Sequence, residues 1–379
     1  MEAAILASMP SMAANLRRVL AGFHGQKHQA GVDKLLLDLY EPILFRRLNA
    51  ANPEVRRNAL SIFLDAFPLR DPQEGNEETD RRLGEQFALL TMALRDEVPA
   101  VRVAAVHGVC RVLNEYWELI PAAVTAGYIK QLAGELAVDG ASPAVRAAVA
   151  EALAALVDNA LAQPLLKAVL PQLEPMLYDA SARVRCAFAD LLLALRGIRA
   201  LRWHDVVAPQ RLLDVMASDV PPVSERIQRL LLPSYLPDLE SGPALVAALL
   251  RTSPDAGRAF CQYLVGGYAP PGAAKPTARP SGMAVHEDMV VGLISDLKMH
   301  LLEAPLEAQD NGGRGKASVK SGRAKGRSKR KKGQQQSDGE DTEEDADVRR
   351  RMVQARHVWC GCSAFRQLVL TLLPHAMTM

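Results

Sequence analysis

Arginine and aspartate recur at a regular interval along the first part of the chain, and both can bind oppositely charged groups. The positions with this pattern are Asp96 and Arg102, Asp139 and Arg146, and Asp179 and Arg185. Guanidinium groups bind phosphates as well as carboxylates, so the row is either a set of phosphate contacts or a ladder of ion pairs between repeats. A ladder requires a regular interval and phosphate binding does not. The spacing therefore favours the ladder, with these residues as structural positions.

A second group of cations lies between Arg314 and Lys332, where every charged residue is basic and Gly and Ser fill the gaps. We expect this segment to be disordered. Its candidates for binding DNA phosphates, or for a nuclear-import signal, are Lys325, Arg327, Lys329, Arg330, Lys331 and Lys332. The acidic run from Asp338 to Asp347 competes for these cations, so a self-neutralising linker is the alternative. Ser337 and Thr342 precede acids and are candidate phosphorylation positions.

No set of residues predicts an enzyme, a cofactor site or a metal site. The chain has no Gly-rich loop followed by Lys-Ser or Lys-Thr, the pattern that cradles nucleotide phosphates. Cys360 and Cys362 with His357 resemble half of a zinc site, but the second pair of ligands is missing, which favours free thiols. His107 and Cys110 share a helical face, and a small apolar helix position explains both better than a ligand pair.

The composition predicts a soluble intracellular protein. The five cysteines are odd in number and mostly isolated in apolar stretches, which indicates a reducing compartment and no disulfide framework. The first residues lack the features of a secretion signal, and no apolar stretch reaches the roughly 20 residues of a membrane span. Ala and Leu supply most of the apolar content, which favours helices.

A short phrase recurs that ends one helix and begins the next. Its copies begin at Asn52, Asp96, Asp139, Asp179 and Asp219, about 40 to 46 residues apart, the period of HEAT or armadillo units. We expect each Asp to accept hydrogen bonds from the free amides at the start of the second helix. Val and Arg follow in the first four copies, and in the fifth the arginine is displaced to Arg226.

Apolar residues at helical spacing flank each copy and predict a pair of helices per repeat. After the phrase they are Val101, Val106, Val109, Cys110 and Leu113; Val145, Val149, Ala152 and Leu156; and Val184, Phe188, Leu191, Leu192 and Leu195. Before it they are Leu83, Phe87, Leu90 and Leu94; Ile129, Leu132 and Leu136; and Leu166, Val169, Leu173 and Leu177. A pair cannot bury its apolar face alone, so the pairs must stack.

Several ordered segments resemble a known family. They are Leu39–Phe45, Phe67–Pro72, Gly108–Arg111, Tyr116–Pro121, Gly134–Asp139, Asp158–Leu166 and Val184–Leu193. Together they resemble the HEAT region of the G-type, non-SMC subunit of condensin II over about residues 30 to 265. The resemblance implies a scaffold in the nucleus and on mitotic chromosomes that binds the kleisin subunit, through it the SMC ATPase pair, and the DNA backbone without sequence preference. It also implies that the ATPase chemistry belongs to other subunits.

These observations predict an all-α protein, an α-solenoid of HEAT-type helical hairpins with a disordered charged tail. The expected organisation is a helical lead-in at 1–32, a solenoid at 33–240, further helices at 241–302, a basic then acidic linker at 303–347, and one more helix at 348–379. The chain is shorter than is usual in the family, which indicates a fragment or shortened form. The alternative function is a generic HEAT adaptor, such as a nuclear-transport or phosphatase scaffold, which would share the period but not the family-like segments.

Overall fold

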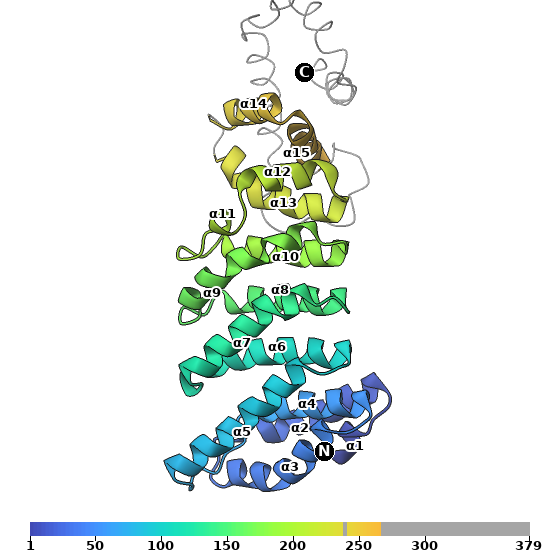
Figure 1. Cartoon of the computed structure of the whole chain (residues 1–379), viewed down its shortest axis with the longest axis vertical. Helices are drawn as coiled ribbons and strands as arrows, with labels where there is room; N and C mark the ends of the chain where they lie inside the picture. The colour runs from blue at the N-terminus through green and yellow to red at the C-terminus, as the bar shows by residue number, and fades with distance from the viewer. Residues whose placement is uncertain (238–240, 267–379) are drawn as a thin grey trace, which may run out of the picture. The chain divides into compact units, whose positions relative to one another are not determined.

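A computed structural model describes residues 1–237 and 241–266, and the regular elements in these ranges are all helical (Figure 1). The chain divides into two compact units, one spanning Met1–Pro233 and one beginning at Ser234. The prediction of an all-α fold is therefore confirmed. Within the described ranges, no helix combines the length and apolar character needed to cross a membrane.

Unit 1 is a series of helix pairs preceded by α1 (Glu2–Ile5) and α2 (Pro10–His24). The pairs are α3 (Val32–Leu48) with α4 (Pro53–Ala66), α5 (Asn76–Leu94) with α6 (Pro99–Tyr116), α7 (Ala122–Gly134) with α8 (Pro143–Leu156), α9 (Gln163–Val169) and η3 (Leu170–Tyr178) with α10 (Ala182–Leu195), and α12 (Pro209–Ser218) with α13 (Pro221–Tyr235). Three short elements connect them: η1 (Trp117–Leu119), η2 (Leu136–Val138) and α11 (Trp203–Val206). The second helices stack side by side, α4 on α6, α6 on α8 and α8 on α10 (Figure 1).

The core lies between the two helices of each pair and between successive pairs. The apolar positions predicted on the second helices, from Val101 to Leu195, are all buried. Close packing between α4 and α6 depends on Gly108, since a Cβ at this position would lie 2.1 Å from Cδ1 of Leu64. The stack is therefore a continuous core that no single pair forms alone.

The first helix of the fourth pair differs from the prediction. The sequence predicts one regular helix through Leu166, Val169, Leu173 and Leu177, but the chain forms α9 followed by the 3-10 element η3. Pro171 and Pro175 cause the difference, because proline has no amide hydrogen for the α-helical bond and its ring clashes with the preceding turn. Leu166, Leu173 and Leu177 are still buried, whereas Val169 is only half-buried.

The aspartates of the phrase do not cap the second helices, which corrects the prediction made for them. The residues at the cap positions of α6, α8 and α10 are Val98, Ser142 and Ser181, and none makes a side-chain cap bond. Asp96, Asp139 and Asp179 lie two or three residues earlier, and each accepts hydrogen bonds from turn amides just after it. Aspartate commonly fixes tight turns in this way. At the start of α4, by contrast, Asn52 acts as a cap and accepts from the amide of Glu54 at 2.9 Å.

The described part of unit 2 contains two helices, α14 (Gly242–Thr252) and α15 (Pro254–Gly266), which pack against each other. Tyr235 and Phe260 form an edge-on ring contact within this unit, with centroids 5.7 Å apart. The helix predicted at 286–302, the charged segment at 303–347 and the helix predicted at 348–379 lie outside the described residues.

Candidate functional site

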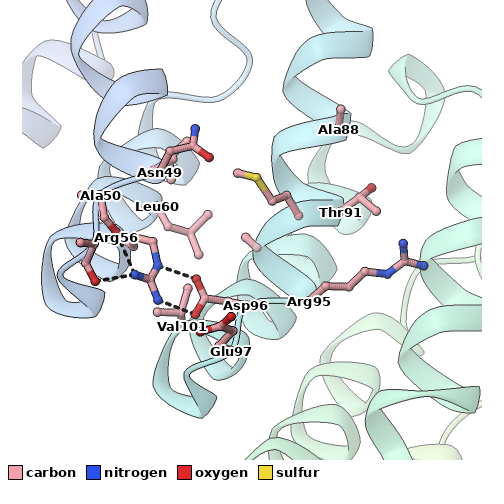
Figure 2. A pocket seen from close by; sticks show the side chains of 14 residues that line it. Asn49, Ala50, Arg56, Leu60, Ala88, Thr91, Arg95, Asp96, Glu97 and Val101 are labelled. Atoms are coloured by element: carbon pink, nitrogen blue, oxygen red, sulfur yellow. Dashed lines mark hydrogen bonds and ion pairs between the residues drawn. The ribbon is translucent and has the colours of Figure 1, made fainter.

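The turn between α3 and α4 is joined to the next repeat by Arg56. Its Nε and Nη2 donate to the two carboxylate oxygens of Asp96, at 2.7 and 2.8 Å. Its Nη1 donates to the backbone carbonyls of Ala50 and Ala51, at 2.8 and 3.0 Å (Figure 2). One guanidinium therefore holds its own turn and the turn of the following repeat together, in the bidentate geometry for which arginine is suited.

Ion pairs between an arginine of one turn and the aspartate of the next recur along the stack, and we call this row the Arg–Asp ladder. Its further ion pairs are Arg102 with Asp139 (2.7 Å), Arg146 with Asp179 (2.6 Å) and Arg185 with Asp219 (2.6 Å). In each, Nη1 of the arginine also donates to the backbone carbonyl of the aspartate in its own turn. Arg146 and Arg185 repeat the bidentate geometry of Arg56, whereas Arg102 binds Asp139 through Nη2 and its buried Nε has no hydrogen-bond partner among the described residues. The structure thus brings together every arginine and aspartate that the spacing singled out, each arginine with the aspartate of the next repeat.

The ladder ends at α13, where the fifth phrase departs from the others. Ser224 occupies the position after valine, is buried, and donates from Oγ to the carbonyl of Met216 at 2.7 Å. The displaced Arg226 pairs instead with Asp190 of α10, at 2.9 Å. Asp219 therefore accepts from Arg185, but its own repeat supplies no arginine in the ladder position.

The rungs are shielded from water, which strengthens them. The side chains of Arg102 and Asp139 are 10% and 9% exposed. Burial opposes ionisation of Asp96 and Asp219, but hydrogen bonds from their arginines and from turn amides outweigh it and lower the pKa of both carboxyls. For Asp179 the hydrogen bond from Arg146 is the main cause of the lowered pKa. These carboxylates are therefore held in the ionised state.

The ladder arginines have little capacity left for another ligand. A guanidinium has five N–H donors, and in Arg56 four hydrogen bonds to the carboxylate and two carbonyls engage three of its nitrogens. A phosphate would have to displace a carboxylate that is already desolvated. The geometry supports a structural role for these residues, and a phosphate site in the folded part of the chain must use other cations.

A groove of about 710 Å³ lies beside the first rung, between the ends of α3 and α5. Leu48, Leu60, Met92 and Val101 provide apolar walls, and the Arg56–Asp96 pair closes one side (Figure 2). Asn49 and Glu97 add polar groups at its edge, whereas Arg95 points away from the other side chains (Figure 2). Its size lies within the range of pockets that hold small ligands or anchoring side chains.

The remaining sequence candidates do not assemble a catalytic or metal site among the described residues. Cys110 is buried, and burial raises the pKa of its thiol to about 12. His107 is exposed instead, with Nε2 3.6 Å from a carboxylate oxygen of Glu151, so the prediction of a small apolar position holds for Cys110 and is wrong for His107. Within these ranges no group of three His, Cys, Asp or Glu residues is arranged to hold a metal ion. Lys325 to Lys332, His357, Cys360 and Cys362 lie outside the described residues.

Two further polar clusters were missed by the sequence reasoning. Asp65 of α4 accepts from Arg17 of α2 at 2.8 Å and from Arg111 of α6 at 3.2 Å, which joins three helices. Lys27 donates to the carbonyls of Ala66 and Pro68, and burial lowers its pKa to about 8. Neither cluster follows the repeat period, so no signal in the phrase could have revealed it. Arg56 and Asp219, by contrast, stand at regular positions of the phrase, so the spacing could have predicted them as members of the ladder.

The family model and the curated proteins that match this chain are all subunits of condensin II. Residues 1–71 match the family described as condensin II non structural maintenance of chromosomes subunit. Condensin-2 complex subunit G2 of Xenopus laevis is 40% identical over 263 residues, covering 69% of this chain and 23% of that protein. The proteins of the same name from Danio rerio and Homo sapiens are 40% and 38% identical, each over 65% of this chain and 22% of theirs.

A crystal structure of an engineered protein covers 81% of this chain and 73% of its own, at 17% identity and a TM-score of 0.38, which is too low to support an argument. The relationship therefore rests on the sequence matches. The chain spans under a quarter of the length of the curated relatives it matches. Over about two thirds of its length, this chain is a homologue of the G2 subunits of condensin II.

Proposed function

We propose that this chain acts as a non-catalytic scaffold subunit of a condensin II complex, in the nucleus and on chromosomes. The observation that carries the proposal is the 40% identity to subunits of that name over 263 residues, a stretch about as long as the described helical part of the chain. The ladder supports a scaffold role, because its aspartates and arginines stabilise turns and are not free for chemistry.

The proposed partner of the solenoid is the kleisin subunit, and through it the SMC ATPase pair. A surface made of several repeats binds well only if the repeats keep a fixed spacing, since ordering them on binding would reduce affinity. The Arg–Asp ladder provides this fixed spacing from Arg56 to Asp219. The binding surface is thereby preorganised.

A second part of the proposal is DNA contact through the basic tail. Lys325, Arg327 and Lys329 to Lys332 would bind phosphates without sequence preference, or serve as an import signal. Such contacts displace counterions from the phosphates, so binding would fall steeply with salt. The acidic run that follows competes for the same cations.

Co-elution of the full chain with the condensin II kleisin from the same source tests the scaffold proposal. We expect a complex that survives moderate salt. Met92→Glu places a charge in the groove, and Leu161→Glu is the matched control, because both side chains are exposed and Leu161 does not line the groove. Loss of the complex with Met92→Glu alone assigns the groove to the kleisin surface. Failure of the unmodified chain to bind would contradict the scaffold role proposed here.

A further inference from the structure

Large apolar side chains are exposed along the edge of unit 1 formed by the turns of the Arg–Asp ladder, which we call the ladder edge. After α3, the large exposed apolar residues described in this unit are Met92, Val138, Leu161, Tyr178 and Val220. All except Leu161 lie within four residues of a ladder aspartate. Single exposed apolar residues are ordinary on a protein surface, but a row that follows the repeat period is a candidate interaction surface.

Val138 and Tyr178 occupy the same position in successive repeats. Each directly precedes its aspartate and follows two buried residues, and their exposed fractions are 65% and 56%. Arg146 joins the two turns, because its Nη1 donates to the carbonyl of Asp139 at 2.6 Å and its Nε donates to the carboxylate of Asp179 at 2.6 Å. The two side chains are therefore neighbours on the ladder edge, about 8–10 Å apart, the usual spacing of packed helices.

Pro175 adds a third apolar group to this row. It is exposed and lies three residues before Tyr178, the position that Glu135 holds relative to Val138. Glu135 reaches back to the preceding repeat, where its carboxylate lies 3.8 Å from Nη2 of Arg95. Because Arg95 holds the position of Val138 in its own repeat, the same geometry places Pro175 beside Val138. These three residues, Val138, Pro175 and Tyr178, form one apolar surface, which we call the Val–Pro–Tyr patch.

The charges that border the Val–Pro–Tyr patch are paired with one another. The ladder aspartates are bound to arginines, and Arg95 lies beside Glu135. Glu174, which precedes Pro175 in the chain, pairs with Arg211. A Cβ at Gly140, two residues after Val138, would meet no atom within 4 Å, so the space beside the patch is open. The patch is therefore an accessible apolar surface with balanced charge around it, which matches a partner of low net charge.

We propose that the Val–Pro–Tyr patch binds a proline-rich peptide segment of low net charge in the polyproline II conformation, with an apolar residue at every third position. Polyproline II has three residues per turn and rises about 3.1 Å per residue, so its side chains repeat about every 9 Å. This repeat matches the spacing of Val138 and Tyr178, whereas an α-helix repeats about every 5.4 Å and would be out of register. The exposed ring of Tyr178 can pack on a proline, and its hydroxyl can donate to a peptide carbonyl.

This site goes beyond the proposed scaffold function and is separate from the groove beside Arg56, so each can fail while the other stands. The patch belongs to the third and fourth helix pairs, whereas the groove lies between the first and the second. One guanidinium, that of Arg146, holds the two turns that carry the patch. Docking therefore needs no rearrangement of these turns, which limits the entropy lost on binding.

Fluorescence anisotropy of a labelled peptide of four Leu-Pro-Pro repeats, titrated with the full chain, tests the site. We expect saturable binding that Tyr178→Ala weakens about tenfold or more, the size of effect usual for loss of an aromatic anchor. The matched control Leu161→Ala truncates an exposed apolar side chain between α8 and α9 and should leave the affinity unchanged. Binding should change little between low and moderate salt, because the charges around the patch are paired.

A second peptide of the same composition, with its leucines grouped at one end, tests the register and should bind more weakly. Equal affinity for the two peptides would overturn the site, as would equal losses in Tyr178→Ala and Leu161→Ala. Absence of saturable binding by the unmodified chain, or a steep fall of affinity with salt, would also overturn it. Thermal unfolding shows whether each variant is folded. If Tyr178→Ala is not, Val138→Ser replaces it, and an unchanged affinity in that variant overturns the site.

Discussion

The ladder edge and the α10–α11 loop contain the same kind of residue in opposite situations. Along the edge, each arginine meets an aspartate supplied by the turn of the next repeat, as Arg146 meets Asp179 at 2.6 Å. In the loop, Arg199 and Arg202 stand in a connection between repeats that faces no such turn, and they find no carboxylate among the described residues. The repeat period decides the difference. A cation in phase with the period meets the aspartate of the next turn and stabilises the stack, whereas Arg199 and Arg202 stand out of phase with it and meet none.

Acid should remove the rungs at Asp96, Asp179 and Asp219 and gives the largest expected effect. The pKa values of Asp96, Asp179 and Asp219 are lowered in the folded chain, so their stabilisation is present above the unfolded pKa of about 3.9 and is lost as pH falls through the lower folded values. Urea unfolding midpoints should show little change from these groups between about pH 7 and pH 5 and a steep fall below about pH 4.

A variant with Asn at all three positions separates the ladder from other carboxylates. Asparagine keeps a side-chain acceptor for the turn amides but has no charge to titrate. The urea unfolding midpoint of this variant should be lower than that of the unmodified chain at neutral pH and should fall less in acid. If the variant and the unmodified chain lose the same stability below pH 4, other acids are responsible and the ladder is not the acid-sensitive element.

Removal of one rung should have a smaller but still large effect. Asp179→Ala leaves Arg146 shielded and without its carboxylate, and it removes the acceptor for the amide of Ser181. We expect a loss of about 3 kcal/mol in the free energy of unfolding, as for other broken charge pairs shielded from water. The control Asp190→Ala breaks the pair with Arg226, whose side chains are 50% and 32% exposed, and should lose less than about 1 kcal/mol. Equal losses in chemical denaturation would show that position on the ladder makes no difference.

Much of the fold could be predicted because the repeat period sets two patterns in the sequence, the apolar stripe of each helix and the interval between arginines and aspartates. Val145, Val184 and their helical partners begin an apolar stripe after each phrase, and the same spacing brings Arg102 opposite Asp139. A pattern along the sequence is enough to predict this fold because each repeat contacts mainly its neighbours. The G-type condensin II resemblance could likewise be recognised from ordered segments of the sequence.

The features that could not be predicted depend on three-dimensional placement. The turn role of Asp96 differs from a helix cap by two residues, a shift that composition does not reveal. His107 and Cys110 are three residues apart, yet only Cys110 is buried, because the packing of α6 against its neighbours sets the boundary between buried and exposed positions. The lack of partners for Arg199 could not be inferred either, since several acids are near it in sequence and only the fold shows that none reaches it.

The loop arginines should give the smallest effect on stability, which completes the contrast with the ladder. Arg199→Gln with Arg202→Gln removes two charges that make no ion pair within the described residues, so the free energy of unfolding should change by no more than about 0.5 kcal/mol. Arg185→Gln, a single substitution on the ladder, should lose about 2 kcal/mol or more, because Asp219 would keep its burial and lose its bidentate partner. Chemical denaturation of the two variants side by side measures this. A destabilised loop variant would mean that its arginines support the fold. The position of an arginine relative to the repeat period would then not distinguish arginines that stabilise the stack from those available to a partner.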